Sequence, residues 1–184
     1  MNSLVRLESD ELLALARHDL KHERYDAALL KLKQARSETS GQQIPAGVLA
    51  ELGRLYSRLG LRARAKEAFQ EFLAREPEAL QERFELGLTL FEDGAAEAAL
   101  GLWEQVLRTS PLHPPALFYS SLALAQRGSF AEALQLSQTL LSKVNVDNLY
   151  HGRAKDLIQR IEKDPNYRNH VDKGRLAAES RVQH

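Results

Sequence analysis

A spacing of 34 residues recurs along this chain and restricts its fold more than any other feature. A step of 34 residues leads from Gly60 to Gly94 and then to Gly128, and the same step leads from Ala65 to Ala99. Apolar residues recur at helical spacing on both sides of each of these glycines. A period of this length is typical of stacked supersecondary units. The sequence therefore predicts a series of helical hairpins, each of which turns at a glycine.

Further residues coincide at the same period. They are Leu52–Gly53 with Leu86–Gly87, Phe69 with Trp103, and Pro77 with Pro111. A Leu-Gly pair, a turn glycine, a small Ala, an aromatic residue and a closing Pro together resemble the signature of the tetratricopeptide repeat (TPR) family. The resemblance implies an all-α fold, a right-handed α-solenoid of about four TPR-like helical hairpins.

The period also suggests how the chain is divided. We expect a solenoid over residues 1–163, with repeats at about 9–42, 46–79, 80–113 and 114–147 and a capping helix at 148–162. Glu23 stands at the turn of the first repeat, and the fourth has Ser121 and Ser137 in place of the paired glycine and the aromatic residue. Terminal repeats are expected to be atypical. Residues 164–184 are polar, and we expect a mobile tail.

Composition excludes several classes of function. Lys and Arg together number 25, as do Asp and Glu, so there is no net charge to attract nucleic acid or an anionic membrane. The chain has no cysteine, which rules out disulfides and thiolate metal sites. We find no secretory signal and no apolar run that could insert into a membrane, so we expect a cytoplasmic protein without a cofactor.

One pair of side chains has the spacing of a metal site. His18 and His22 lie one helical turn apart, as two zinc ligands do in a metalloprotease helix. However, Asp19 stands where that motif has a longer Glu as general base, and no convincing third ligand follows. We interpret these histidines as surface residues and identify no catalytic or metal-binding site, with a metal-dependent hydrolase as a minor alternative.

The inner face of the predicted solenoid offers a candidate binding site, because the first helix of each hairpin lines the concave surface of such repeats. Helical phase places two groups of residues there, one basic and one apolar. The basic group is Arg17, Lys21, Arg54 and Arg58, and the apolar group is Phe84, Leu88, Phe91, Phe118, Tyr119 and Leu122. The alternatives are a solvated basic face and an aromatic inter-repeat core.

The sequence thus favours a non-catalytic protein–protein interaction module, an adaptor or scaffold that binds a peptide segment of a partner in its groove. The two groups of residues predict a partner segment that is amphipathic and has an acidic end. One alternative is a secretion-type or assembly chaperone that holds such a segment. Another is a self-assembling structural protein, a homo-oligomer in which the tail or capping helix of one copy occupies the groove of the next.

Overall fold

The structure is a computed structural model that describes residues 7–37 and 44–168. These residues form α-helices joined by turns, without a strand among them. The chain divides into two compact units, Met1–Ala95 and Ala96–His184. The expected tail and the end of the first repeat extend beyond the described residues. None of the described helices is both long and apolar enough to span a bilayer.

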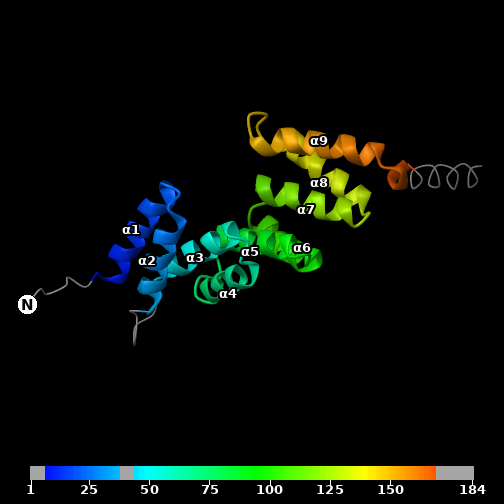
Figure 1. Ribbon diagram of the computed structural model, residues 1–184. Helices are drawn as coiled ribbons and strands as arrows, with labels where there is room; N and C mark the ends of the chain where they lie inside the picture. Colours follow the sequence, from blue (N-terminus) through cyan, green and yellow to red (C-terminus); the bar gives the residue numbers. More distant parts are fainter. Residues whose placement is uncertain (1–6, 38–43, 169–184) are drawn as a thin grey trace, which may run out of the picture. The chain divides into compact units, whose positions relative to one another are not determined.

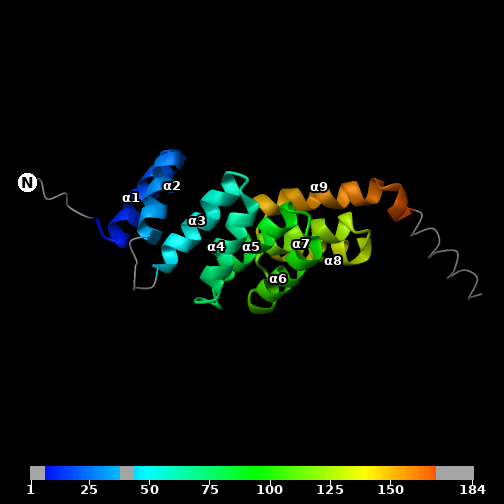
Figure 2. The same ribbon diagram turned by 60° about the horizontal axis from the view of Figure 1, so that its bottom comes forward.

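Unit 1 contains five helices among its described residues (Figures 1 and 2). They are α1 (Ser9–Lys21), α2 (Tyr25–Ser37), α3 (Ala46–Arg58), α4 (Arg62–Leu73) and α5 (Leu80–Glu92). α1 packs on α2 and α3 packs on α4, while α2 and α4 also contact the helices that follow them. Helical hairpins are therefore present at residues 9–37 and 46–73, within the predicted repeats at about 9–42 and 46–79.

The described part of unit 2 contains α6 (Ala96–Thr109), α7 (Pro114–Gln126), α8 (Phe130–Lys143) and α9 (Leu149–Lys163), and residues 165–168 are again helical. α7 and α8 form a hairpin, and α9 packs on both (Figure 1). The buried residues of α9, which are Ala154, Leu157 and Ile161, face that hairpin. α9 lies within one residue of the expected capping helix.

The turns inside the hairpins use the left-handed backbone region. Gly60, Gly94 and Gly128 have φ of 71°, 84° and 85°. Glu23 has a φ of 57° at the corresponding turn between α1 and α2. A residue with a Cβ pays an energetic cost in this region, so the first hairpin turns in the same way as the others but under strain.

Close packing inside the hairpins explains the small residues of the repeat. A Cβ atom on Gly53 would lie only 2.6 Å from the ring of Phe69, which is buried. In the α7–α8 hairpin, Ser121 and Ser137 replace this glycine–aromatic pair, and their hydroxyls lie 2.7 Å apart in a hydrogen bond. The glycine–aromatic pair of one hairpin is thus replaced in the other by two small residues that are hydrogen-bonded to each other.

Candidate functional site

Two adjoining hollows lie on the first helices of the unit 1 hairpins and on α5. One, of about 260 Å³, is lined by Leu20, Lys21, Glu51, Arg54, Leu55 and Arg58. The other, of about 380 Å³, is lined by Arg54, Ser57, Arg58, Phe69, Glu85, Leu88, Thr89 and Glu92. Because both include Arg54 and Arg58, we treat them as one feature, the unit 1 groove. It brings together four of the predicted site residues, Lys21, Arg54, Arg58 and Leu88.

Arg54 is held by carboxylates from two helices. Its Nε donates to Glu85 Oε2 at 2.9 Å, its Nη2 donates to Glu82, and its Nη1 lies 3.8 Å from Glu51 Oε1. Burial would by itself lower the pKa of Arg54, but Glu85, Glu51 and Glu82 raise that pKa above its ordinary value. The charge of Arg54 is therefore largely compensated within the fold.

Arg17 is compensated in the same way, since its Nε donates to Glu51 Oε1 at 2.9 Å. The repeat contained a signal for this arrangement: Arg17 corresponds to Arg54, because the turn at Glu23 lies 37 residues before the turn at Gly60, and a step of 34 residues leads from Glu51 to Glu85. Each arginine thus pairs with a glutamate at one shared repeat position on the next first helix. The predicted basic group is thus interleaved with carboxylates.

Lys21 and Arg58 differ from these two arginines, because neither forms an ion pair with a carboxylate of the described residues. The Arg58 guanidinium donates from Nη1 to the Tyr25 hydroxyl at 2.9 Å, and its carbon lies 5.3 Å from the centre of the Tyr25 ring. This role of Tyr25 was not predicted from the sequence. Lys21, which lines the hollow between α1 and α3, and Arg58, which lines both hollows, thus keep charge that an acidic ligand can use.

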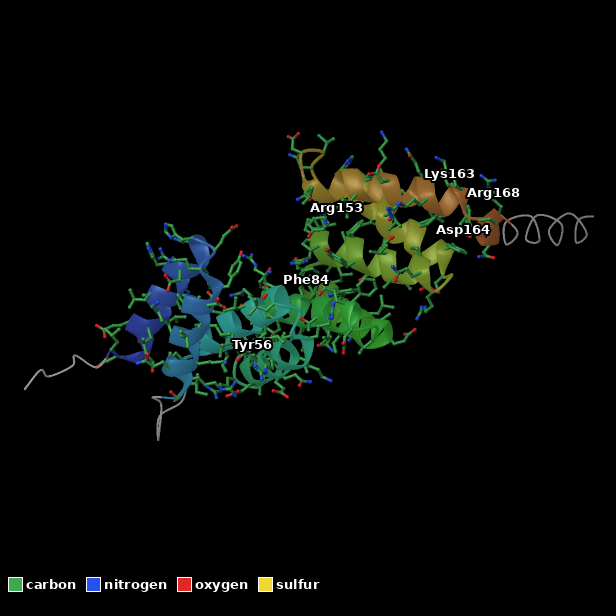
Figure 3. The ribbon with its side chains drawn as sticks, viewed as in Figure 1. Tyr56, Phe84, Arg153, Lys163, Asp164 and Arg168 are labelled. Carbon is green, nitrogen blue, oxygen red and sulfur yellow. The ribbon has the colours of Figure 1, made fainter. Side chains whose placement is uncertain are left out.

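The predicted apolar residues of α5 differ in exposure. Leu88 is half-buried and lines the unit 1 groove, as described above. Phe84, labelled in Figure 3, is only 5% exposed, and Phe91 is half-buried without lining that groove. A ring as buried as Phe84 offers little surface to a ligand, which agrees with the alternative that it belongs to the core.

The predicted apolar residues of α7 lie in unit 2, beside α9. Phe118 and Leu122 line a hollow of about 240 Å³ together with Arg153, Asp156, Leu157 and Arg160. The Phe118 ring lies 5.3 Å from that of Tyr119 and 5.6 Å from that of Tyr150. Arg153, labelled in Figure 3, stacks over Phe118 and Tyr150 at 5.9 and 5.3 Å.

These contacts give Phe118 and Tyr119 a structural role in the packing of α7 beside α9. Burial raises the pKa of the Tyr150 hydroxyl, as expected for a ring enclosed by this cluster. Tyr150, Arg153 and Arg160 were not among the predicted site residues, because α9 was expected only to cap the last hairpin and the inner face was expected to be formed by the first helix of each hairpin.

The histidine pair of α1 is present at the surface. The His18 and His22 rings have centres 4.4 Å apart, and His22 Nδ1 lies 2.8 Å from the His18 carbonyl oxygen. Asp19, in contrast to the two histidines, is buried and accepts hydrogen bonds from Lys31 and Arg24. Both partners lower the pKa of Asp19, and Lys31 is the larger cause. Within residues 7–37 and 44–168 no group of three potential ligands is found. Asp19 stabilises the first hairpin and is not placed to act as a general base.

Comparison with known proteins gives one curated relative and several solved structures. Over 106 residues the chain is 29% identical to a protein named probable biofilm formation methyltransferase WspC, from Pseudomonas putida. The matched part is 58% of this chain but only 25% of that protein, so the chain spans about a quarter of the relative's length. The shared segment therefore represents a minor part of a larger protein.

Two solved structures illustrate the likeness in fold. MamA 41-end from Desulfovibrio magneticus RS-1 has a TM-score of 0.72 and 18% identity, over 94% of this chain and 96% of that one. YrrB, described as a TPR protein with an unusual peptide-binding site, has a TM-score of 0.70 and 18% identity, over 80% and 74% of the two chains. At such low identity the likeness concerns the fold, and it confirms the predicted all-α solenoid class.

The family itself is identified from the sequence. The family model described as tetratricopeptide repeat matches residues 50–107 and 96–144. Together these matches span more than half of the 184 residues. They cover the glycine turns at Gly60, Gly94 and Gly128, whose backbone is left-handed. With its helical hairpins and its 34-residue period, the chain belongs to the tetratricopeptide repeat family.

Proposed function

We propose that this protein is a non-catalytic interaction module, an adaptor or scaffold, that binds a peptide segment of a partner protein in the unit 1 groove. The observation that carries the proposal is the pair of adjoining hollows that share Arg54 and Arg58. Family membership supports a role in protein–protein interaction, and YrrB, which has this fold, is described as having a peptide-binding site. The methyltransferase activity named for the Pseudomonas relative is not carried over, because the chain matches only a quarter of that protein.

The side chains of the groove indicate which ligand fits. Lys21 and Arg58 both line the hollow formed by α1 and α3, where they can pair with the carboxylates of a ligand. Leu88, which is half-buried, lines the other hollow and offers apolar surface to a bulky side chain. The ligand is therefore an amphipathic segment whose acidic end lies toward α1 and whose apolar anchor lies against α5.

The partner can be captured with the full-length protein as bait, and its binding segment located by peptide mapping. Surface plasmon resonance at two salt concentrations then tests the groove. Leu88→Ala should weaken binding mainly through faster dissociation, by about 1–2 kcal/mol if Leu88 contacts an anchor. Lys21→Glu with Arg58→Glu should slow association and reduce its dependence on salt, because exposed charges steer the encounter and are screened by ions.

Lys66→Glu provides a matched control, since Lys66 is exposed on α4 of the same unit and lines neither hollow. Circular dichroism must show that each variant keeps its helices. If Leu88→Ala and the double charge reversal both bind the mapped segment as tightly as the unmodified protein does, the unit 1 groove is not the binding site.

A further inference from the structure

A second groove lies in unit 2, on a surface where no site was predicted from the sequence. It has a volume of about 440 Å³, and three helices, α6, α7 and α8, contribute its walls. Its lining comprises Leu100, Leu107, Leu124 and Leu136, the charged residues Glu97, Glu104, Arg127 and Glu132, and Gly101 and Ser120. We call it the α6–α8 groove. It shares no residue with the hollow beneath α9.

Gly101 is the unexpected residue in this groove. It lies inside α6, where glycine is less favourable than alanine. A Cβ atom added to Gly101 would meet no heavy atom within 4 Å, whereas one added to Gly53 would meet a buried ring at 2.6 Å. The packing of the fold therefore requires glycine at position 53 but not at position 101. What glycine provides at position 101 is an open wall that the backbone of another molecule can approach closely.

The rim of the groove is acidic and accessible. The side chains of Glu97, Glu104 and Glu132 are 73%, 65% and 68% exposed. Arg127 lies 2.7 Å from Glu97 and 3.9 Å from Glu132, and Arg108 lies 2.7 Å from Glu104. Three carboxylates thus share two guanidinium groups, and all of them remain open to solvent. This leaves net negative charge around a floor of leucines.

The shape of the groove suits a helix. The α6 residues that line it are spaced as one face of a helix, and the part from Glu97 to Leu107 is about 15 Å long at 1.5 Å per residue. This length corresponds to about three turns of a helix lying alongside. Helices that pack at close distance place small residues at the point of contact, and Gly101 lies near the middle of the lined stretch of α6.

We propose that the α6–α8 groove binds an amphipathic helix of a partner protein, with a stripe of leucine-like side chains toward the groove and Lys or Arg at its edges. The apolar stripe packs on the leucine floor, and the basic residues pair with Glu97, Glu104 and Glu132. Gly101 marks the closest approach of the two backbones. The α6–α8 groove shares no residue with the unit 1 groove.

The test is a peptide-display selection on the full-length protein, with random peptides about 16 residues long, enough for about four helical turns. The library is selected on the unmodified protein and counter-selected on Gly101→Leu. We expect enriched peptides with apolar residues at helical spacing and Lys or Arg beside them. The affinity of a selected peptide is then measured by fluorescence anisotropy at two salt concentrations.

Three variants separate binding from stability. Gly101→Leu should weaken binding of the selected peptide at least tenfold. Gly101→Ala should weaken this binding less and should raise the midpoint of thermal unfolding by a few degrees, because helix propensity improves. Glu104→Lys with Glu132→Lys should weaken binding severalfold, and less so at high salt. Glu162→Lys is the charge control, since this exposed residue of α9 lies outside the groove.

Two results would overturn the proposal. One is that no selected peptide binds Gly101→Leu more weakly than it binds the unmodified protein. The other is that the enriched peptides lack basic residues. Lys21→Glu with Arg58→Glu should leave the selected peptide's affinity unchanged. A loss of affinity in that variant would assign the peptide to the unit 1 groove, so failure of this proposal can be told apart from failure of the proposed function.

Discussion

The pairing of Gly53 with Phe69 predicts how strongly one hairpin depends on a missing side chain. A Cβ on Gly53 would lie 2.6, 2.7 and 2.8 Å from three atoms of the Phe69 ring, whereas carbon atoms normally pack at about 3.5–4.0 Å. The ring is 1% exposed, so it has no solvent to move into. Gly53→Ala should therefore lower the free energy of unfolding by about 1–3 kcal/mol, the range for overpacking a core.

The α7–α8 hairpin shows how this conflict can be relieved. There the Ser121 hydroxyl donates to the Ala133 carbonyl at 2.6 Å and lies 2.7 Å from the Ser137 hydroxyl. Gly53→Ser with Phe69→Ser would reproduce that pair in the α3–α4 hairpin. Phe69→Ser alone should cost about 3–5 kcal/mol, as for other truncations of buried rings. The double variant should be more stable than the sum of the single changes predicts, by about 1 kcal/mol or more.

Urea unfolding followed by circular dichroism measures these changes. Trp103, the single tryptophan of the chain, is buried in unit 2, so its fluorescence reports that unit separately. Gly101→Ala is the matched control: the same substitution inside a helix, but in open space, should raise stability by up to about 1 kcal/mol. Equal effects of Gly53→Ala and Gly101→Ala, or strict additivity in the double variant, would refute the packing argument.

Three further predictions concern single side chains. Glu23→Gly should stabilise unit 1 by about 1 kcal/mol in thermal unfolding, because the φ of 57° suits glycine. A loss of stability would show that the contacts of the Glu23 side chain contribute more than the backbone strain costs. His113 Nδ1 accepts a hydrogen bond from the Ala116 amide at the start of α7, and burial lowers the pKa of His113. The stability that this cap contributes is therefore present above pH ~6.5 and lost as pH falls. His113→Asn should keep the cap and reduce this loss of stability at low pH, whereas an unchanged dependence of stability on pH would contradict the prediction. Asp19→Asn should destabilise the first hairpin at neutral pH, because the Asp19 carboxylate, whose pKa Lys31 and Arg24 lower, is then lost. The difference in unfolding free energy between the variant and the unmodified protein should narrow below pH ~4 in denaturant titrations. A difference that stays constant with pH would argue against these ion pairs.

The sequence by itself determined the hairpins and their turns. Apolar spacing along a segment fixes whether it is helical and which face is buried, and a glycine in the left-handed region fixes where the chain reverses. Gly60, Gly94 and Gly128 were therefore located from the period alone, and the segment that became α9 was recognised from its apolar face. The family resemblance followed from the same local signals.

The tertiary structure decided what each surface residue does. Helical phase placed Arg54 and Phe118 on the predicted inner face, but only the packing of separate helices brought Glu82 and Glu85 to Arg54 and the aromatic ring of Tyr150 to Phe118. A change of one residue in register rotates a side chain by about 100° around its helix. Contacts between helices some 30 residues apart therefore depend on how those helices cross, which no local pattern specifies. For the same reason the α6–α8 groove, built from three helices, became visible only in the folded chain.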